Sequence, residues 1–209
     1  GFPTYNWKKM QEDGFSWWKQ RFEQMSHYFD TFRIDHILGF FRIWSIPTHA
    51  VQGILGRFVP CLPVGIEEFT AKGIEFDYIR FCKPYITEEV LLEIFGEQQF
   101  IVKEQFLLKD RNSAWVIAPS FDTQIKIEKY FEHNTANEIS PKVKEGMFEL
   151  IANVLLFEEP ESQQKKFHFR ISINKTWSFK QCSPYVREKL MELYHDYFYN
   201  RQDHFWYEE

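Results

Sequence analysis

The sequence has few cysteines, no excess of basic residues and no long apolar run. Its three cysteines among 209 residues, Cys61, Cys82 and Cys182, are odd in number and not closely spaced. This pattern favours reduced thiols in a cytoplasmic protein over disulfides or a zinc site. The net charge is −5 without a basic stripe, so we expect no nucleic-acid partner. No stretch approaches the ~18–20 apolar residues of a membrane span, and no secretory signal opens the chain, so we expect no membrane partner.

Two further kinds of site are missing. The sequence has no glycine-rich phosphate loop and no cluster of metal-ligating residues. His168, His195 and His204 lack ligand spacing to any cysteine or to a second histidine. We therefore expect no cofactor and no metal, and we interpret these histidines as ordinary polar or half-buried residues.

Aromatic residues are abundant instead. They make up 19% of the chain, with 23 Phe, 10 Tyr and 7 Trp, while the hydrophobic share of 44% and the charged share of 26% are ordinary for a globular protein. Aromatic rings dominate core energetics, so one interpretation is a phenylalanine-rich core. The other is a set of platforms that stack on sugars, and composition leaves both open.

The pattern of apolar residues predicts a mixed order of helices and strands. A helix from Ser16, with Ser16 as its cap, carries an apolar stripe at Phe15, Trp18, Phe22, Met25 and Phe29 that we expect in a core. It leads into a short buried strand at 32–35. Further along we expect helices at 87–95 (Thr87 as cap, Gly96 as stop), 140–156 and 184–206, and strands at 115–118, 124–130 and 167–173.

The candidate site lies at the end of the 32–35 strand. Alternation places Arg33 and Asp35 on one face. Burial of these two charged side chains costs hydration energy, and this cost is offset only if they pair or take part in chemistry. A paired Asp35 stays ionised, as a covalent nucleophile requires, and α/β barrels place catalytic groups at the carboxyl ends of strands. The alternative is a structural ion pair. Asp35 and His36 as metal ligands are disfavoured, because no third ligand is visible.

A second candidate residue lies in an irregular stretch from Val51 to Pro63, punctuated by glycine and proline. Long irregular stretches in compact domains are often functional loops. We assign Arg57 in this stretch as a substrate-contacting cation; a solvated loop arginine is the alternative.

Three segments in order resemble the 4-α-glucanotransferases of the amylomaltase family. They are GFPTYNW at 1–7, GFSWW at 14–18 and RIDHILGFFRIWSIP at 33–47. The family strings are W-G-x-P-x-Y-x-W, G-F-x-x-W and R-I-D-H-x-x-G-F-x-x-x-W-x-I-P. Within the family the chain is most similar to the plant cytosolic disproportionating enzymes and their bacterial relatives. The Leu38 variant of the third segment is typical of this type, whereas many bacterial amylomaltases carry Arg at that position.

The resemblance implies an α/β fold, a fragment of a (β/α)8 barrel that carries an α+β insertion subdomain. Residues 1–64 would be part of the catalytic barrel, and residues 65–209 the insertion. A complete barrel takes ~250 residues, and both ends of this chain look cut. We therefore expect a piece of a longer protein, whose remainder is needed to complete the barrel.

The resemblance also implies roles for named residues. Asp35 would be the nucleophile of a retaining mechanism and Arg33 would hold it ionised. His36 and Tyr5 would contact the sugar, and Trp44 would shape the pocket or pack behind it. The substrates would be α-1,4-glucans and maltooligosaccharides, with maltose as donor and a glycogen-like polymer as acceptor.

The acid/base glutamate of the family stands in a G-E-D-L-G-like motif, and this sequence has none. The chain alone should therefore be inactive. The alternative function is a non-catalytic carbohydrate-binding or spacer module.

Overall fold

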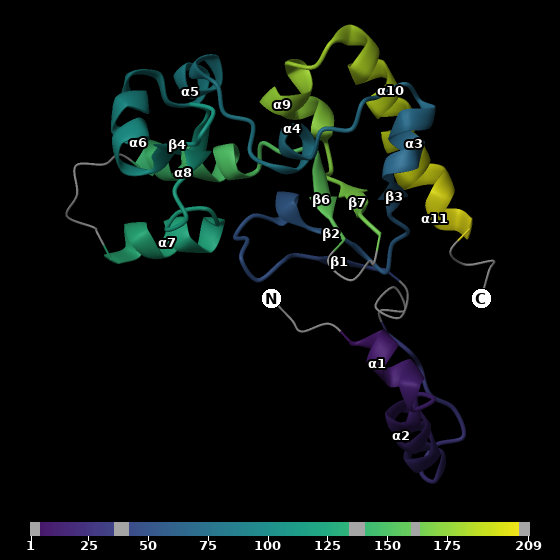
Figure 1. The fold of residues 1–209 in the computed structure, drawn as a ribbon. Coiled ribbons are helices and arrows are strands. Elements are labelled where there is room, and N and C mark those ends of the chain that lie inside the picture. Colours follow the sequence, from purple (N-terminus) through teal and green to yellow (C-terminus); the bar gives the residue numbers. More distant parts are fainter. Residues whose placement is uncertain (1–4, 36–41, 134–140, 160–163, 205–209) are drawn as a thin grey trace. The chain divides into compact units, whose positions relative to one another are not determined.

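A computed structural model describes residues 5–35, 42–133, 141–159 and 164–204. The chain is mixed α/β, with short strands in three small sheets. These described strands do not form a barrel. The chain divides into two compact units: Gly1–Ser45 with Phe58–Pro60, and Ile46–Arg57 with Cys61–Glu209 (Figure 1). The predicted boundary between a barrel part at 1–64 and an insertion at 65–209 refers to the complete barrel, so it stays a prediction.

The first unit holds helices α1 (Trp7–Glu12) and α2 (Ser16–Ser26). The helix predicted from Ser16 is confirmed, but Ser16 is its first residue rather than its cap. Asp13 instead accepts hydrogen bonds from the Ser16 backbone N–H (3.2 Å) and hydroxyl (2.8 Å). No residue of α2 is buried, so the expected core packing of its stripe is wrong for this unit: Trp18, Phe22 and Met25 are half-buried, and Phe15 and Phe29 are exposed.

The strand predicted at 32–35 is absent. Residues 31–34 have no regular structure, and Phe32 and Ile34 are 46% and 43% exposed. A strand exists by pairing with neighbours, and no described segment pairs with this one. The first unit's strand is instead β1 (Ile43–Ser45), which joins β2 (Arg57–Val59) in a two-stranded sheet.

In the second unit, one hydrophobic core lies among α5 (Glu88–Phe95), α6 (Gln99–Gln105), α7 (Gln124–His133), α8 (Pro141–Ile151) and the hairpin β4 (Leu107–Lys109)–β5 (Trp115–Ile117). Both predicted ends of α5 are confirmed. The Thr87 side chain caps the helix by accepting from the Val90 N–H, and Gly96 ends it with a positive φ of +56°. Helix α8 packs closely on α5, since a Cβ at Gly146 would lie 2.4 Å from the Phe95 ring.

Two sequence predictions fail in this core. Residues 124–130 form helix α7 rather than a strand, because Gln124 and Ile127 are buried three residues apart and Phe131 packs on the same core. The alternation that suggested a strand came from Ile125 and Ile127 alone. Helix α8 ends at Ile151 rather than near 156, because Leu156 begins the next strand; Ser140 lies outside the described residues.

A second core in this unit surrounds a three-stranded antiparallel sheet, β3 (Val64–Gly65), β7 (Lys166–Phe169) and β6 (Leu156–Glu158), in the order β3–β7–β6. Helices α3 (Ile66–Ala71), α4 (Tyr78–Cys82), α9 (Trp177–Lys180) and α10 (Pro184–His195) contribute to it. The predicted strand 167–173 stops at Phe169 and turns at Ser172 (φ +55°). The predicted helix 184–206 is interrupted by a π-helical segment (Asp196–Asn200) before α11 (Arg201–His204).

The buried amide of Gln124 connects α7 to the segment before β2. Its Oε1 accepts from the backbone N–H groups of Val51 and Gln52, each at 2.9 Å, and its Nε2 donates to the Phe148 carbonyl at 3.2 Å. Gln124 is fully buried. The amide therefore replaces water for three backbone groups at once.

Replacing Gln124 with Met should lower the free energy of unfolding by about 2 kcal/mol, because buried backbone groups lose their partner while side-chain volume is kept. Urea denaturation measures this change. Gln105→Met, at an exposed position of α6, is the matched control and should change little. Equal stability of the two variants would contradict the anchoring role.

Candidate functional site

The pair of Arg33 and Asp35 is present, although the buried strand whose alternation would place them on one face is absent. Arg33 Nε lies 2.8 Å from Asp35 Oδ1, and the Arg33 and Asp35 side chains are 87% and 78% exposed. An ion pair this exposed contributes little to stability. It does fix one carboxylate oxygen of Asp35 and leaves the other without a hydrogen bond from the described residues. His36, the next predicted site residue, lies outside the described residues.

An aromatic cluster in the same unit includes the predicted site residue Tyr5. Its ring centroid lies 5.0 Å from that of Trp7 and 5.5 Å from that of Trp18. Trp18 stacks on Phe22, and Phe22 stacks on Phe32 at 4.9 Å, so the ring contacts extend to the segment that carries Asp35. Tyr5 and its neighbour Trp17 remain 42% and 45% exposed. Exposed rings of this kind offer apolar faces for stacking.

The predicted site residue Trp44 lies on β1. Its ring contacts Phe58 of β2 edge to face, with centroids 5.0 Å apart. The guanidinium of Arg42 lies over the same Phe58 ring at 4.7 Å. Trp44 is half-buried. Trp44 thus packs against Phe58 in this unit, and its role in shaping a sugar pocket or packing behind it stays a prediction.

Arg57 belongs to the second unit and is tightly paired there. Its Nη1 lies 3.1 Å from Glu159 Oε2 and 3.0 Å from His168 Nε2, and its side chain is 25% exposed. The alternative of a solvated loop arginine is therefore wrong. Sequence reasoning missed both partners, because they lie more than 100 residues along the chain and Glu159 stands in no motif.

His168 stands at the centre of a buried polar chain. Its side chain is fully buried, so the expected half-burial of His168 is wrong. Its Nδ1 lies 2.9 Å from the Tyr197 hydroxyl, and its Nε2 contacts Glu159 Oε2. The Cys61 thiol donates to the Tyr197 oxygen at 3.0 Å. The alternation of Phe167, His168 and Phe169 predicts His168 on the face opposite the two phenylalanines, so it gives no signal for this burial.

Burial lowers the pKa of His168 to about 4, and the positive charge of Arg57 adds to this effect; Glu159 acts in the opposite direction. The ring is therefore neutral at neutral pH. This assigns Nε2–H as a donor to Glu159 and Nδ1 as the acceptor from Tyr197. The chain of donors runs from Cys61 through Tyr197 to His168, and from His168 and Arg57 to Glu159.

The C-terminal segment holds the loop next to Cys61. Gln202, 3% exposed, accepts from the Leu62 N–H (3.0 Å) and donates to the Leu62 carbonyl (3.2 Å). Arg201 donates to the Pro63 carbonyl at 2.7 Å and pairs with Glu68. Loop 61–63 thus has fixed geometry where it leads into β3.

Within the ranges that the structure describes, no group of three or more His, Cys, Asp or Glu side chains is placed to hold a metal ion. In the same ranges, no helix has both the length and the apolar character needed to cross a membrane.

Comparison with known proteins identifies the family. Residues 1–208 match the family model described as 4-alpha-glucanotransferase. The chain is 35% identical over 210 residues to 4-alpha-glucanotransferase DPE2 of Oryza sativa subsp. japonica. This alignment covers 99% of this chain and 22% of the rice protein. It is 48% identical over 58 residues (28% of this chain, 10% of the relative) to the chloroplastic/amyloplastic 4-alpha-glucanotransferase of Solanum tuberosum.

A bacterial relative, the 4-alpha-glucanotransferase of Chlamydia pneumoniae, is 33% identical over 73 residues, 35% of this chain and 12% of its own length. No solved structure matches. The chain thus spans about a fifth of the length of the rice relative. The resemblance predicted from three short segments is confirmed, and the match extends over nearly every residue. The chain belongs to the 4-alpha-glucanotransferase family.

Proposed function

We propose that the chain supplies the nucleophile of a retaining 4-α-glucanotransferase that moves glucosyl or maltooligosyl units between α-1,4-glucans. The family match over residues 1–208 carries this proposal. In it, residues 1–64 are part of a (β/α)8 barrel and residues 65–209 are an insertion in that barrel. Maltose is the donor and a glycogen-like polymer the acceptor, in the cytoplasm.

In the proposed mechanism Asp35 attacks the anomeric carbon of the donor sugar. An acid protonates the glycosidic oxygen as its bond breaks, and a covalent β-glycosyl-enzyme forms. The same group, now a base, takes the proton from the acceptor hydroxyl as that oxygen displaces Asp35, which restores the α linkage. The exposed carboxylate oxygen of Asp35 and its Arg33 contact of 2.8 Å support this role.

The other site residues take part by binding. His36 and Tyr5 contact the sugar, Trp44 shapes the pocket or packs behind it, and Arg57 contributes a cation to the substrate region. Acceptor sugar held on aromatic faces excludes water from the intermediate, which favours transfer over hydrolysis. The exposed rings of Tyr5 and Trp17 support such stacking.

The proposal requires a second carboxyl group about 5–5.5 Å from Asp35. The sequence contains no G-E-D-L-G-like segment, so this group comes from elsewhere in the complete enzyme. The test compares the full-length protein with the isolated 209-residue chain, each given maltose and glycogen. Glucose release by the full-length protein alone is expected. Release by the isolated chain would refute the missing acid/base, and no release by a folded full-length protein would refute the transferase.

A further inference from the structure

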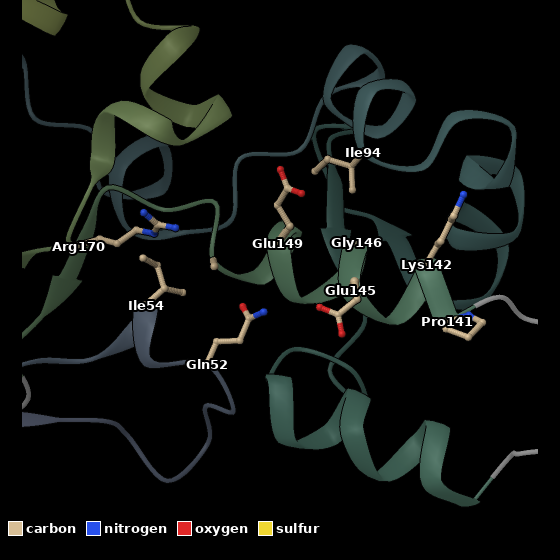
Figure 2. A pocket seen from close by; sticks show the side chains of 10 residues that line it. Gln52, Ile54, Ile94, Pro141, Lys142, Glu145, Gly146, Glu149 and Arg170 are labelled. Atoms are coloured by element: carbon tan, nitrogen blue, oxygen red, sulfur yellow. The ribbon is translucent and has the colours of Figure 1, made fainter.

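A cavity in the second unit, lined by both apolar and charged side chains, contains none of the residues assigned to the proposed reaction. It has a volume of about 850 Å³ and opens between the segment 52–54, helix α8 and Arg170. Figure 2 shows Gln52 and Ile54 on one wall, Glu145 and Glu149 on α8, and Arg170 at one end. Cavities of about 300–1,000 Å³ are typical of small-molecule sites.

Arg170 provides unsatisfied donors at this cavity. The residue is 8% exposed, and its Nη1 donates to the carbonyls of Ile171 (2.8 Å) and Ser172 (3.3 Å). Its Nε is buried without a hydrogen-bond partner, and no described group bonds to Nη2. Burial lowers the pKa of Arg170 to about 10, so it stays charged at neutral pH. Nη2 is the donor that a ligand in the cavity can satisfy, because the buried Nε has almost no accessible surface.

The α8 wall supplies acceptors. Glu145 and Glu149 are exposed and lie one helical turn apart. Trp177 Nε1 donates to Glu149 Oε1 at 3.1 Å, which orients this carboxylate and leaves Oε2 for a ligand. On the opposite wall Gln52 Oε1 accepts from the Gln124 amide at 3.0 Å, so the Gln52 amide group is oriented as well.

The mixture of charges selects the class of ligand. Two carboxylates disfavour an anion, and Arg170 with Lys142 disfavours a cation. A neutral molecule whose groups both donate and accept satisfies both walls, and adjacent hydroxyls of a sugar do so. The apolar side chains of Ile54 and Ile94 offer surface for the C–H faces of the ring.

We infer that this cavity binds a short stretch of α-1,4-glucan through hydroxyl contacts to Arg170, Glu145 and Glu149. The inference rests on the proposed function for the identity of the sugar. It adds a glucan site made wholly of residues from the second unit. Such a site holds a polymeric acceptor on the enzyme while its end is extended, and multivalent holding strengthens binding without a change at the reacting centre.

The test is hydrogen–deuterium exchange of the full-length protein carrying Asp35→Asn, with maltoheptaose as the probe. We expect protection of peptides from segments 50–55, 141–152 and 168–172. The double variant Glu145→Ala/Glu149→Ala should lose this protection and weaken maltoheptaose binding at this site by about tenfold, or 1.4 kcal/mol. The matched control is Glu97→Ala/Glu104→Ala, two exposed glutamates away from the cavity.

Several outcomes overturn the inference. Protection at peptides from 31–47 but not at the cavity segments would refute the cavity site and leave the transferase intact. Equal protection by cellohexaose, which has β-1,4 linkages, would refute selectivity for α-glucan. Unchanged protection in the Glu145/Glu149 double variant would refute the assigned contacts. Failure of the transferase itself is recognised separately, by the absence of glucose release from the wild-type protein.

Discussion

Asp35→Asn in the full-length protein should lower glucose release from maltose, with glycogen as acceptor, by at least about a thousandfold. The amide has nearly the same shape as the carboxylate but cannot form the glycosyl-enzyme, and loss of a covalent nucleophile has effects of this size or larger. In the isolated 209-residue chain, where the Arg33–Asp35 pair is exposed, the same substitution should leave the melting temperature almost unchanged. Initial rates of glucose release at saturating maltose measure the loss.

The matched control is Asp30→Asn, an exposed aspartate five residues earlier in the chain. It should retain wild-type rates. Equal rates for Asp35→Asn and the wild type would show that the pair at 33 and 35 is structural only, the alternative that the sequence left open. A rate loss accompanied by unfolding, seen by circular dichroism, would likewise remove the support for a nucleophile.

Sequence patterns predicted local features well where the physics is local. The pairing of Arg33 with Asp35 follows from two residues of spacing, and the ends of α5 follow from the side chain of Thr87 and the backbone freedom of Gly96. Helix α7 was mistaken for a strand because a short segment carries too few apolar positions to separate the two periods. Gln124 at the start of α7 is bonded to the backbone of Val51 and Phe148, which are distant in sequence, so its burial cannot be predicted locally.

The segment 31–35 shows a different limit. Its apolar residues Phe32 and Ile34 are nearly half exposed, and among the described residues the ring of Phe22 alone stacks on Phe32. A barrel strand is buried by neighbours on both sides, and those neighbours would come from other parts of the proposed complete barrel. In that setting Asp35 would be desolvated, as expected for a carboxylate at the end of a buried strand.

The network around His168 could not be predicted at all. It joins Arg57, Glu159 and Tyr197, which come from β2, the end of β6 and the π-helical segment, and no spacing rule connects them. Buried polar networks are stable only when each member has its partner. Arg57 is a member of this network rather than a solvated side chain, so its charge is held in a fixed position.

The stability of the protein should fall in acid because of His168. In the unfolded chain the pKa of this imidazole is near 6.5, and in the folded chain burial lowers it to about 4. Above pH 6.5 neither state is protonated. Between pH 6.5 and 4 only the unfolded state takes up the proton, so the free energy of unfolding decreases as the pH falls, by about 3 kcal/mol in total from this residue.

Urea denaturation at pH 7, 5.5 and 4.5 measures this loss against a variant that cannot titrate. His168→Gln is expected to be less stable than the wild type at pH 7, because it keeps only part of the contacts to Glu159 and Tyr197, but its stability should fall less steeply toward pH 4.5. Carboxylates that do not contact residue 168 contribute equally to both proteins. His195→Gln, at an exposed histidine of α10, should keep the wild-type slope. If His168→Gln kept the full slope, the pKa of His168 would be the same in the folded and unfolded states, which would contradict the neutral buried ring. A steeper fall for His168→Gln than for the wild type would mean that the folded protein protonates His168 first, and Nδ1 would then donate to Tyr197.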